Sequence, residues 1–276
     1  MGVRGLMSYC KRIQRRVIEK EKEKEQSASL SIGIDAFSVI FLFREQRAEF
    51  KAYLESLLAA NHRVTFVMDK RAQKEKKEVV DQRKEIRNDA KQEASGLTSF
   101  TQTDEYEGLD EQQRKVLERH IALKERDAWC LYSEYVKWLK GVIGELGISL
   151  VIAEEEADTV LAKGEHDAIV SSDSDLLILG CKALWIPKFG KDRVIQHDEI
   201  RKEDFLELLG LEGEQLYELA FLAGCDIQPR KIVEIQVAIS LLRFYGSIEK
   251  ICQRVGSVTA ADFEEYKRLR KSAWSF

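Results

Sequence analysis

The sequence has few of the residues that break or cross-link a chain. Only two prolines occur among 276 residues, so long helices are unobstructed. The five cysteines form no C-x-x-C pair, which argues against a structural zinc site, and their odd number and wide spacing favour reduced thiols. No apolar run approaches the roughly 20 residues of a membrane-spanning helix, and no signal-peptide pattern opens the chain. These absences predict a soluble, intracellular protein.

An excess of positive charge is also missing. The formal net charge is −4, although 33% of the residues are charged. An acidic total does not exclude nucleic-acid binding, which needs only a local basic face. Carboxylates gathered around metal ions would also contribute to the negative total. Hydrophobic residues make up 44% of the chain, enough for a sizeable globular core.

Short apolar runs with the composition of buried strands recur in the first two thirds of the chain. They cover residues 30–34, 64–68, 150–152 and 168–170. Helical patterns separate them, and this alternation predicts an α/β fold with a parallel sheet flanked by helices. We expect a single domain over residues 1–276, with ligands binding at the carboxyl ends of the strands.

The segment 70–147 has a different character. Ala72–Glu93 is a helical stretch that is polar nearly all round, Glu111–Gly147 is a second helical stretch, and Ala94–Asp110 reads as a loop. A helix that is polar on every face projects from the body of a protein or bridges parts of it. The part from 200 to 276 is predicted to be all helical.

Seven acids occupy positions after apolar segments. They are Asp35, Asp69, Glu156, Asp158, Asp173, Asp175 and Asp226. Acids at the carboxyl ends of neighbouring strands would meet at one sheet edge and repel one another unless cations neutralised them. Oxygen ligands of this kind suit Mg²⁺ or Mn²⁺, and two such ions can promote in-line displacement at phosphorus.

A plainer explanation exists for each acid alone, because aspartate after a strand is a common helix N-cap. The joint occupation of several strand ends favours the metal site. None of the four histidines lies in these motifs, which favours a metal-bound water as nucleophile over a histidine base.

These motifs together resemble the flap endonuclease (XPG-type) family of structure-specific 5′ nucleases. The resemblance rests on MGVRGL, IGIDAF, VIAEEEAD, AIVSSDSDLLILG, FLAGCD and YGSIEKI, which occur in this order across about residues 1–255. The irregular motifs also resemble flap-endonuclease-like proteins of large DNA viruses. The family implies a 5′ nuclease (PIN-like) fold and hydrolysis of DNA phosphodiester bonds at single-strand/duplex junctions. It also implies two Mg²⁺ ions held by the seven acids, with Glu154 as a rival to Glu156.

The resemblance also implies residues that contact DNA. Lys76 and Arg83 match a basic pair that holds the scissile phosphate beside the catalytic acids Asp35 and Asp175, although an ordinary solvated helix explains their charge equally well. The other candidate DNA contacts are Gly2, Phe41, Arg87, Arg230 and Lys231. Residues 70–147 would form the family's helical arch, with Phe100 and Tyr106 either exposed or packed in its loop. Residues 200–276 would bind duplex DNA.

Two departures from the family pattern limit these expectations. No glycine lines the segment IQPRKIVEIQVAISLLRFY, so the usual helix-hairpin-helix is degenerate and its K⁺-assisted grip is in doubt. No sliding-clamp peptide is visible in SAWSF. A monomer that acts on branched DNA in the nucleus, or at a cytoplasmic replication site if viral, is expected. An RNA-directed 5′ exonuclease and an inactive binding scaffold are the alternatives.

Overall fold

The computed structural model describes residues 3, 5–6, 29–70, 77–129, 133–154, 156–190, 195–225 and 228–272. The chain divides into two compact units. The first combines residues 1–70 with 139–276, and the second covers residues 71–138. None of the helices in the described part of the chain combines the length and the apolarity that crossing a bilayer requires.

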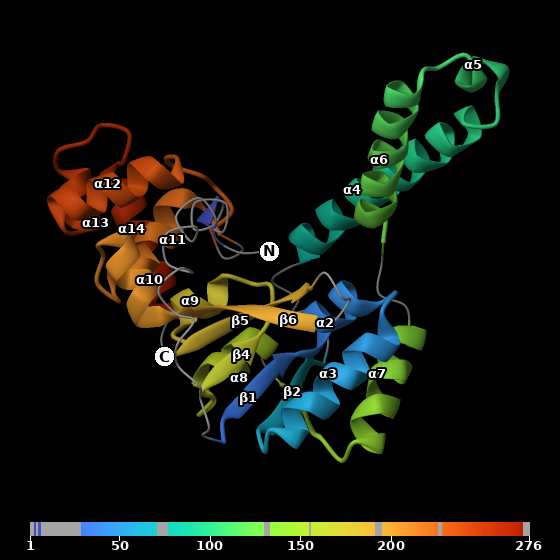
Figure 1. Ribbon diagram of the computed structural model, residues 1–276. Helices are drawn as coiled ribbons and strands as arrows, with labels where there is room; N and C mark the ends of the chain where they lie inside the picture. The colour runs from blue at the N-terminus through green and yellow to red at the C-terminus, as the bar shows by residue number, and fades with distance from the viewer. Residues whose placement is uncertain are drawn as a thin grey trace. The chain divides into compact units, whose positions relative to one another are not determined.

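The first unit is built on a six-stranded sheet in the order β3-β2-β1-β4-β5-β6 (Figure 1). The strands are β1 (Ser31–Asp35), β2 (Arg63–Asp69), β3 (Ser149–Ala153), β4 (Ala168–Val170), β5 (Ala183–Phe189) and β6 (Ile195–Arg201). The first five strands pair in parallel, and β6 pairs antiparallel with β5. The central strands read as continuous apolar runs because helices cover both of their faces.

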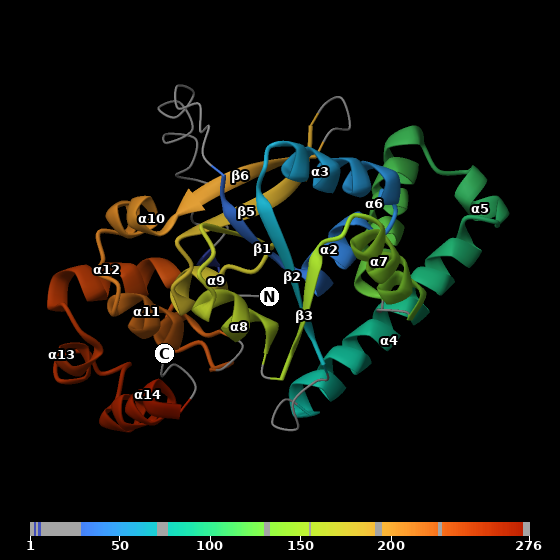
Figure 2. The same ribbon diagram turned by 90° about the horizontal axis from the view of Figure 1, so that it is seen from below.

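Helices lie on either side of this sheet (Figure 2). On one side, α2 (Ala36–Phe43) and α3 (Arg47–Ala59) contact β1 and β2. The other side carries α8 (Ala157–Lys163), which contacts β1, β2 and β3, and α9 (Asp175–Leu179), which contacts β5. The end of α7 (Ser133–Glu145) is tied to α3 by a 2.7 Å ion pair between Lys51 and Glu145.

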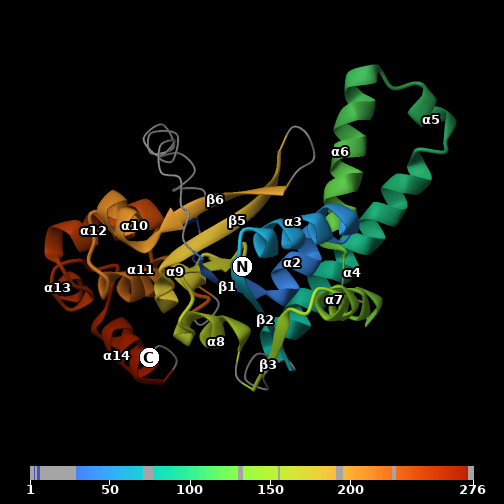
Figure 3. The same ribbon diagram turned by 60° about the horizontal axis from the view of Figure 1, so that its bottom comes forward.

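Five helices follow the sheet and pack together beside α9 (Figure 3). They are α10 (Lys202–Leu209), α11 (Gln215–Ala223), α12 (Ile235–Tyr245), α13 (Ile248–Cys252) and α14 (Ala260–Ser272). The turn after α10 needs a residue in the left-handed conformation, which Gly210 provides with φ +58°. The carbonyl groups of Leu208 and Leu209, at the end of α10, accept hydrogen bonds from the guanidinium of Arg243 on α12.

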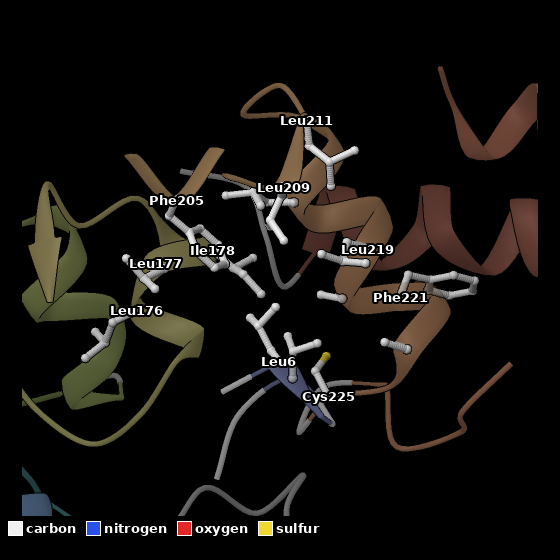
Figure 4. Close-up of a cluster of buried hydrophobic side chains, with 14 of the residues drawn as sticks. Leu6, Leu176, Leu177, Ile178, Phe205, Leu209, Leu211, Leu219, Phe221 and Cys225 are labelled. Carbon is white, nitrogen blue, oxygen red and sulfur yellow. The ribbon is translucent and has the colours of Figure 1, made fainter. Parts of the chain in front are cut away.

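The hydrophobic core joins these helices to the sheet layer. Leu6 is fully buried among side chains of α9 and α11, including Ile178 and Leu219 (Figure 4). Its own turn is fixed by a hydrogen bond from the Leu6 amide to the Val3 carbonyl. Val3 and Leu6 therefore pack into the same core as helices formed by residues much later in the sequence.

The loop between α11 and α12 folds back on the end of α11. The carbonyl of Leu222 accepts hydrogen bonds from the amides of Ile232 and Val233. Arg230 pairs with Asp262, a buried residue that also accepts hydrogen bonds from the amide and hydroxyl of Thr259. This loop lies where the helix-hairpin-helix was expected. It begins at Gly224, whose φ is +83°, and backbone hydrogen bonds and the Arg230–Asp262 pair fix it.

The second unit is a pair of packed helices, α4 (Lys77–Phe100) and α6 (Glu111–Asp127), joined through the short helix α5 (Asp104–Glu107). Asp110 begins α6 with a capping box that includes Gln113. At the tip, the rings of Phe100 and Tyr106 pack edge to face, and the guanidinium of Arg114 lies over Tyr106. Phe100 and Tyr106 thus pack within the tip.

The sequence predicted the parallel strands well and the arch region less well. All four predicted strands occur, and the elements described after Arg201 are helices, as expected. Strands β5 and β6 were not predicted, and the antiparallel β6 makes the sheet mixed. The prediction of a loop from residue 94 was wrong, because α4 continues to Phe100. The helical stretch predicted over Glu111–Gly147 is two helices, since α6 ends at Asp127 and α7 starts at Ser133.

The core predicts a contrast between two phenylalanines. Phe221 is fully buried, whereas the side chain of Phe244 is 81% exposed. We expect Phe221→Ala to lower the free energy of unfolding by about 3–5 kcal/mol, because it leaves a cavity. Phe244→Ala is the matched control and should change it by less than about 0.5 kcal/mol. Urea unfolding followed by circular dichroism measures both, and equal losses would contradict the described core.

Candidate metal centre

Two of the predicted acids end neighbouring strands. Asp35 is the last residue of β1 and Asp69 is the last residue of β2. The strands run parallel, with Asp35 beside Val67 and Asp69 beside Ala153 of β3. Parallel strands present their carboxyl ends at the same edge, so the register alone brings both carboxylates to one edge of the sheet.

The carboxylate of Asp35 also begins a helix. Its Oδ1 accepts hydrogen bonds from the amides of Phe37 at 3.0 Å and Ser38 at 3.1 Å. These are N-cap contacts of α2, so the helix-cap explanation is correct for this acid. The cap does not compete with a role at the sheet edge, because it fixes the direction in which the carboxylate points.

The loop after β4 brings Asp173 and Asp175 to Asp35. The hydroxyl of Ser171 donates to Asp35 Oδ2 at 3.0 Å and accepts from the amide of Asp173 at 3.1 Å. The amide of Asp175 in turn donates to Asp173 Oδ1 at 2.9 Å. The segment therefore folds into a tight turn that begins α9.

The start of α8 is tied to the same edge. Asp69 Oδ1 accepts a 2.7 Å hydrogen bond from the amide of Ala157. Glu156 is the N-cap residue of α8 and Asp158 lies in its first turn. The rival acid Glu154 instead forms an exposed ion pair with Lys70, with an Nζ–Oε1 distance of 2.8 Å.

Mutual repulsion shows that five of the acids gather. Burial, together with repulsion from four nearby carboxylates, raises the pKa of Asp158 to about 8. Those four belong to Asp35, Asp173, Asp69 and Asp175. Burial also raises the pKa of Asp35 to about 6, against the lowering effect of hydrogen bonds from Ser38 and Ser171.

The gathered acids fit a divalent cation by chemistry. Their donors are hard carboxylate oxygens, and a cation would relieve the repulsion that raises the pKa of Asp158. Within the described residues, no three His, Cys, Asp or Glu side chains are close enough to form a ligand set as they stand. Carboxylates that repel one another move apart, so the described arrangement is a gathering of acids rather than a closed coordination shell.

Several predicted site residues cannot be placed. Asp226, Gly2 and Lys76 lie outside the described residues. Arg83 lies in the backbone of α4, and its side chain is also outside the description. Arg87 is half-buried on α4.

The remaining predicted DNA contacts have neighbours within the chain. Phe41 on α2 is 36% exposed, with the guanidinium of Arg44 4.9 Å from its ring centroid, so it is a surface residue rather than core. Arg230 is engaged by Asp262, and Lys231 forms a 2.5 Å ion pair with Glu234. Their DNA-binding roles stay predictions.

Sequence reasoning missed three serines at the site. Ser171 bridges Asp35 and Asp173, and the hydroxyls of Ser38 and Ser172 are 3.0 Å apart. The signal was present in the small polar residues that directly follow a buried strand in SSDSD.

Comparison with known proteins places this site in a family context. The family model of the XPG I-region matches residues 147–226, which include the acids from Glu156 to Asp226. The chain is similar in sequence to proteins named Flap endonuclease 1. It is 26% identical over 290 residues to Flap endonuclease 1 of Babesia bovis, covering 96% of this chain and 40% of that protein. It is 32% identical over 170 residues to Flap endonuclease 1 of Fusarium vanettenii, covering 59% of this chain and 40% of that protein.

The chain thus spans about two fifths of the length of these curated relatives. Among solved structures, it is similar to human GEN1 in complex with Holliday junction DNA, with a TM-score of 0.54 and 16% identity, covering 99% of this chain and 63% of that one. It is also similar to the catalytic core of Rad2, with a TM-score of 0.52 and 19% identity, covering 90% of this chain and 72% of that one. These similarities confirm the expected 5′ nuclease fold.

The raised pKa values predict how stability depends on pH without metal. Since Asp158 and Asp35 bind protons more tightly in the folded than in the unfolded chain, stability should fall as pH rises from about 4 to about 8. Asp158→Asn should reduce this loss in the free energy of unfolding by more than about 1.4 kcal/mol, which is the equivalent of one pKa unit. Urea unfolding in EDTA at pH 5 and pH 8 measures it.

Asp204→Asn is the control for that experiment, because Asp204 is an exposed aspartate on α10. This variant should show the same difference in the free energy of unfolding between pH 5 and pH 8 as the wild type. If Asp158→Asn also leaves it unchanged, the acids do not repel one another as described.

Proposed function

We propose that this chain is a metal-dependent, structure-specific 5′ nuclease that hydrolyses DNA phosphodiester bonds at single-strand/duplex junctions. One observation carries the proposal: acids from β1, β2, α8 and the loop after β4 gather at one edge of the sheet, where hydrogen bonds tie Asp69 to the start of α8 and Asp35 to the loop. A sheet edge so charged is unfavourable in itself, which is the mark of a site built for a function rather than for stability.

Two Mg²⁺ ions, with Mn²⁺ as a substitute, are the cofactors that these donors suit. Asp35, Asp69, Asp158, Asp173 and Asp175 would hold them, with Glu156 and Asp226 completing the set that the family resemblance implies. Bound there, divalent cations supply Lewis-acid chemistry and lower the pKa of a bound water. The chain contributes orientation, because backbone amides and the Ser171 hydroxyl fix the carboxylates of Asp35, Asp69 and Asp173.

Branched or flapped DNA is the proposed substrate. The curated relatives are called Flap endonuclease 1 and, for one Arabidopsis thaliana protein that is 28% identical over 48% of this chain and 19% of its own length, Exonuclease 1. Binding would rest on phosphate contacts rather than on base sequence. Lys76 and Arg83 would hold the scissile phosphate, and the exposed ring of Phe41 is suited to stack on a base beside the cut.

The proposed setting is intracellular replication, repair or recombination of DNA, with the chain acting as a monomer. Among the described residues, the free thiols of Cys181 and Cys252 support a reducing compartment. The helix pair α4–α6 is the proposed arch, and the helices after β6 are the proposed duplex-binding part.

Removal of a single acid tests the metal centre. Asp175→Ala should lower the cleavage rate on a 5′-flap DNA in Mg²⁺ by about a thousandfold, because the acid supports charge stabilisation worth several kcal/mol and each 1.4 kcal/mol is tenfold in rate. Glu154→Gln is the matched control, since Glu154 is an exposed acid paired with Lys70, and it should cleave at the wild-type rate. Equal rates for wild type and Asp175→Ala would reject the site.

The substrate class needs its own experiment. Labelled flap, nicked and single-stranded DNAs, each with a matched RNA version, are compared in Mg²⁺ and in EDTA. We expect cleavage of flap DNA that EDTA abolishes, since the carboxylates cannot act without the ions. Faster cleavage of the RNA versions would identify an RNA-directed exonuclease instead. Binding without cleavage in any metal would identify a scaffold.

A further inference from the structure

The hydroxyl of Ser171 is the direct link between two of the proposed metal ligands. Ser171 is fully buried, directly after β4. It donates its one hydroxyl proton to Asp35 Oδ2 and accepts the amide proton of Asp173. These contacts join the end of β1 to the turn before α9, two segments that are far apart in the sequence.

The backbone holds Ser171 from a third direction. Its amide donates a 3.2 Å hydrogen bond to the carbonyl of Trp185 on β5. The next residue forms a parallel tie, because the amide of Ser172 donates to the hydroxyl of Ser38 at 2.9 Å. The loop after β4 is therefore fixed to the sheet on one side and to the first turn of α2 on the other.

We infer that Ser171 is a positioning residue of the metal centre, and that its hydroxyl sets the spacing between the carboxylates of Asp35 and Asp173. The inference rests on the proposed function, because the spacing of these carboxylates matters only if they bind cations. Ser171 would act through its contacts with Asp35 and Asp173.

The physical need for such a residue follows from charge. Two anionic side chains at one sheet edge repel each other before a cation arrives. A neutral hydroxyl that donates to one carboxylate and accepts from the backbone of the other acid holds both at fixed separation without adding charge. Two-metal chemistry depends on that separation, since the ions must lie roughly 4 Å apart. Groups that orient ligands in this way typically contribute 10–100-fold to metal affinity.

A merely structural role predicts something different. If the serine only stabilised the loop, its removal would lower the unfolding temperature and leave metal affinity unchanged in the folded protein. The two roles are therefore separated by measuring Mn²⁺ binding and stability on the same variants.

Ser171→Ala and Ser171→Thr test the inference. The alanine variant removes the hydroxyl from a buried site with little change in volume, and the threonine variant restores it. We expect Ser171→Ala to weaken Mn²⁺ binding by 10–100-fold in calorimetry, and Ser171→Thr to recover most of it. In flap cleavage, the alanine variant should need a correspondingly higher Mg²⁺ concentration for half-maximal rate and recover at saturation.

Ser174→Ala is the matched control, because Ser174 is a buried serine in the same loop that makes no side-chain cap hydrogen bond. It should bind Mn²⁺ within threefold of wild type. Should Ser171→Ala fail to fold, Ser171→Cys, a weaker donor of similar size, should show a partial loss of affinity. If Ser171→Ala or Ser171→Cys binds Mn²⁺ with wild-type affinity, the inference about Ser171 is overturned while the proposed function still stands. A wild-type protein that neither binds Mn²⁺ nor cleaves DNA overturns the proposed function together with it.

Discussion

Repulsion among carboxylates is the constraint on which this structure depends. Acids that end β1 and β2, begin α8 and flank the start of α9 share one sheet edge, where burial and their mutual repulsion together raise the pKa of Asp158 to about 8. Local hydrogen bonds oppose that repulsion: amides of α2, α8 and α9 each donate to an acid, and Ser171 joins two of them. The edge is thus a strained arrangement that the rest of the sheet must stabilise.

The surrounding fold supplies that stability. Buried apolar strands place the acids by their parallel register, and helices on both faces keep water from the strands. The core of the later helices, into which Leu6 packs, adds a second layer of support beside α9. Because the acids sit at strand ends rather than within the core, they lie at the edge of the sheet where ligands of parallel sheets bind.

Local sequence patterns explain why some features could be predicted and others could not. The first four strands are dense in β-branched residues, so their positions and the acids after them followed from the sequence. Strand β5 contains Pro187 and Lys188, and β6 is mostly polar because it is an edge strand, so neither has the pattern of a buried strand. The role of Ser171 depends on a contact between β1 and the loop after β4, which no local pattern reveals.

The burial of Leu6 has a consequence for biosynthesis. Its pocket is lined by α9 and α11, and a Cβ on the neighbouring Gly5 would meet the Ile235 side chain at 3.1 Å. Leu6 is thus translated well before the residues of α9 and α11 against which it packs. Long-range contacts of this kind slow folding and leave apolar surface exposed in the meantime. Leu6 can therefore reach its place in this core only after α9 and α11 have been synthesised.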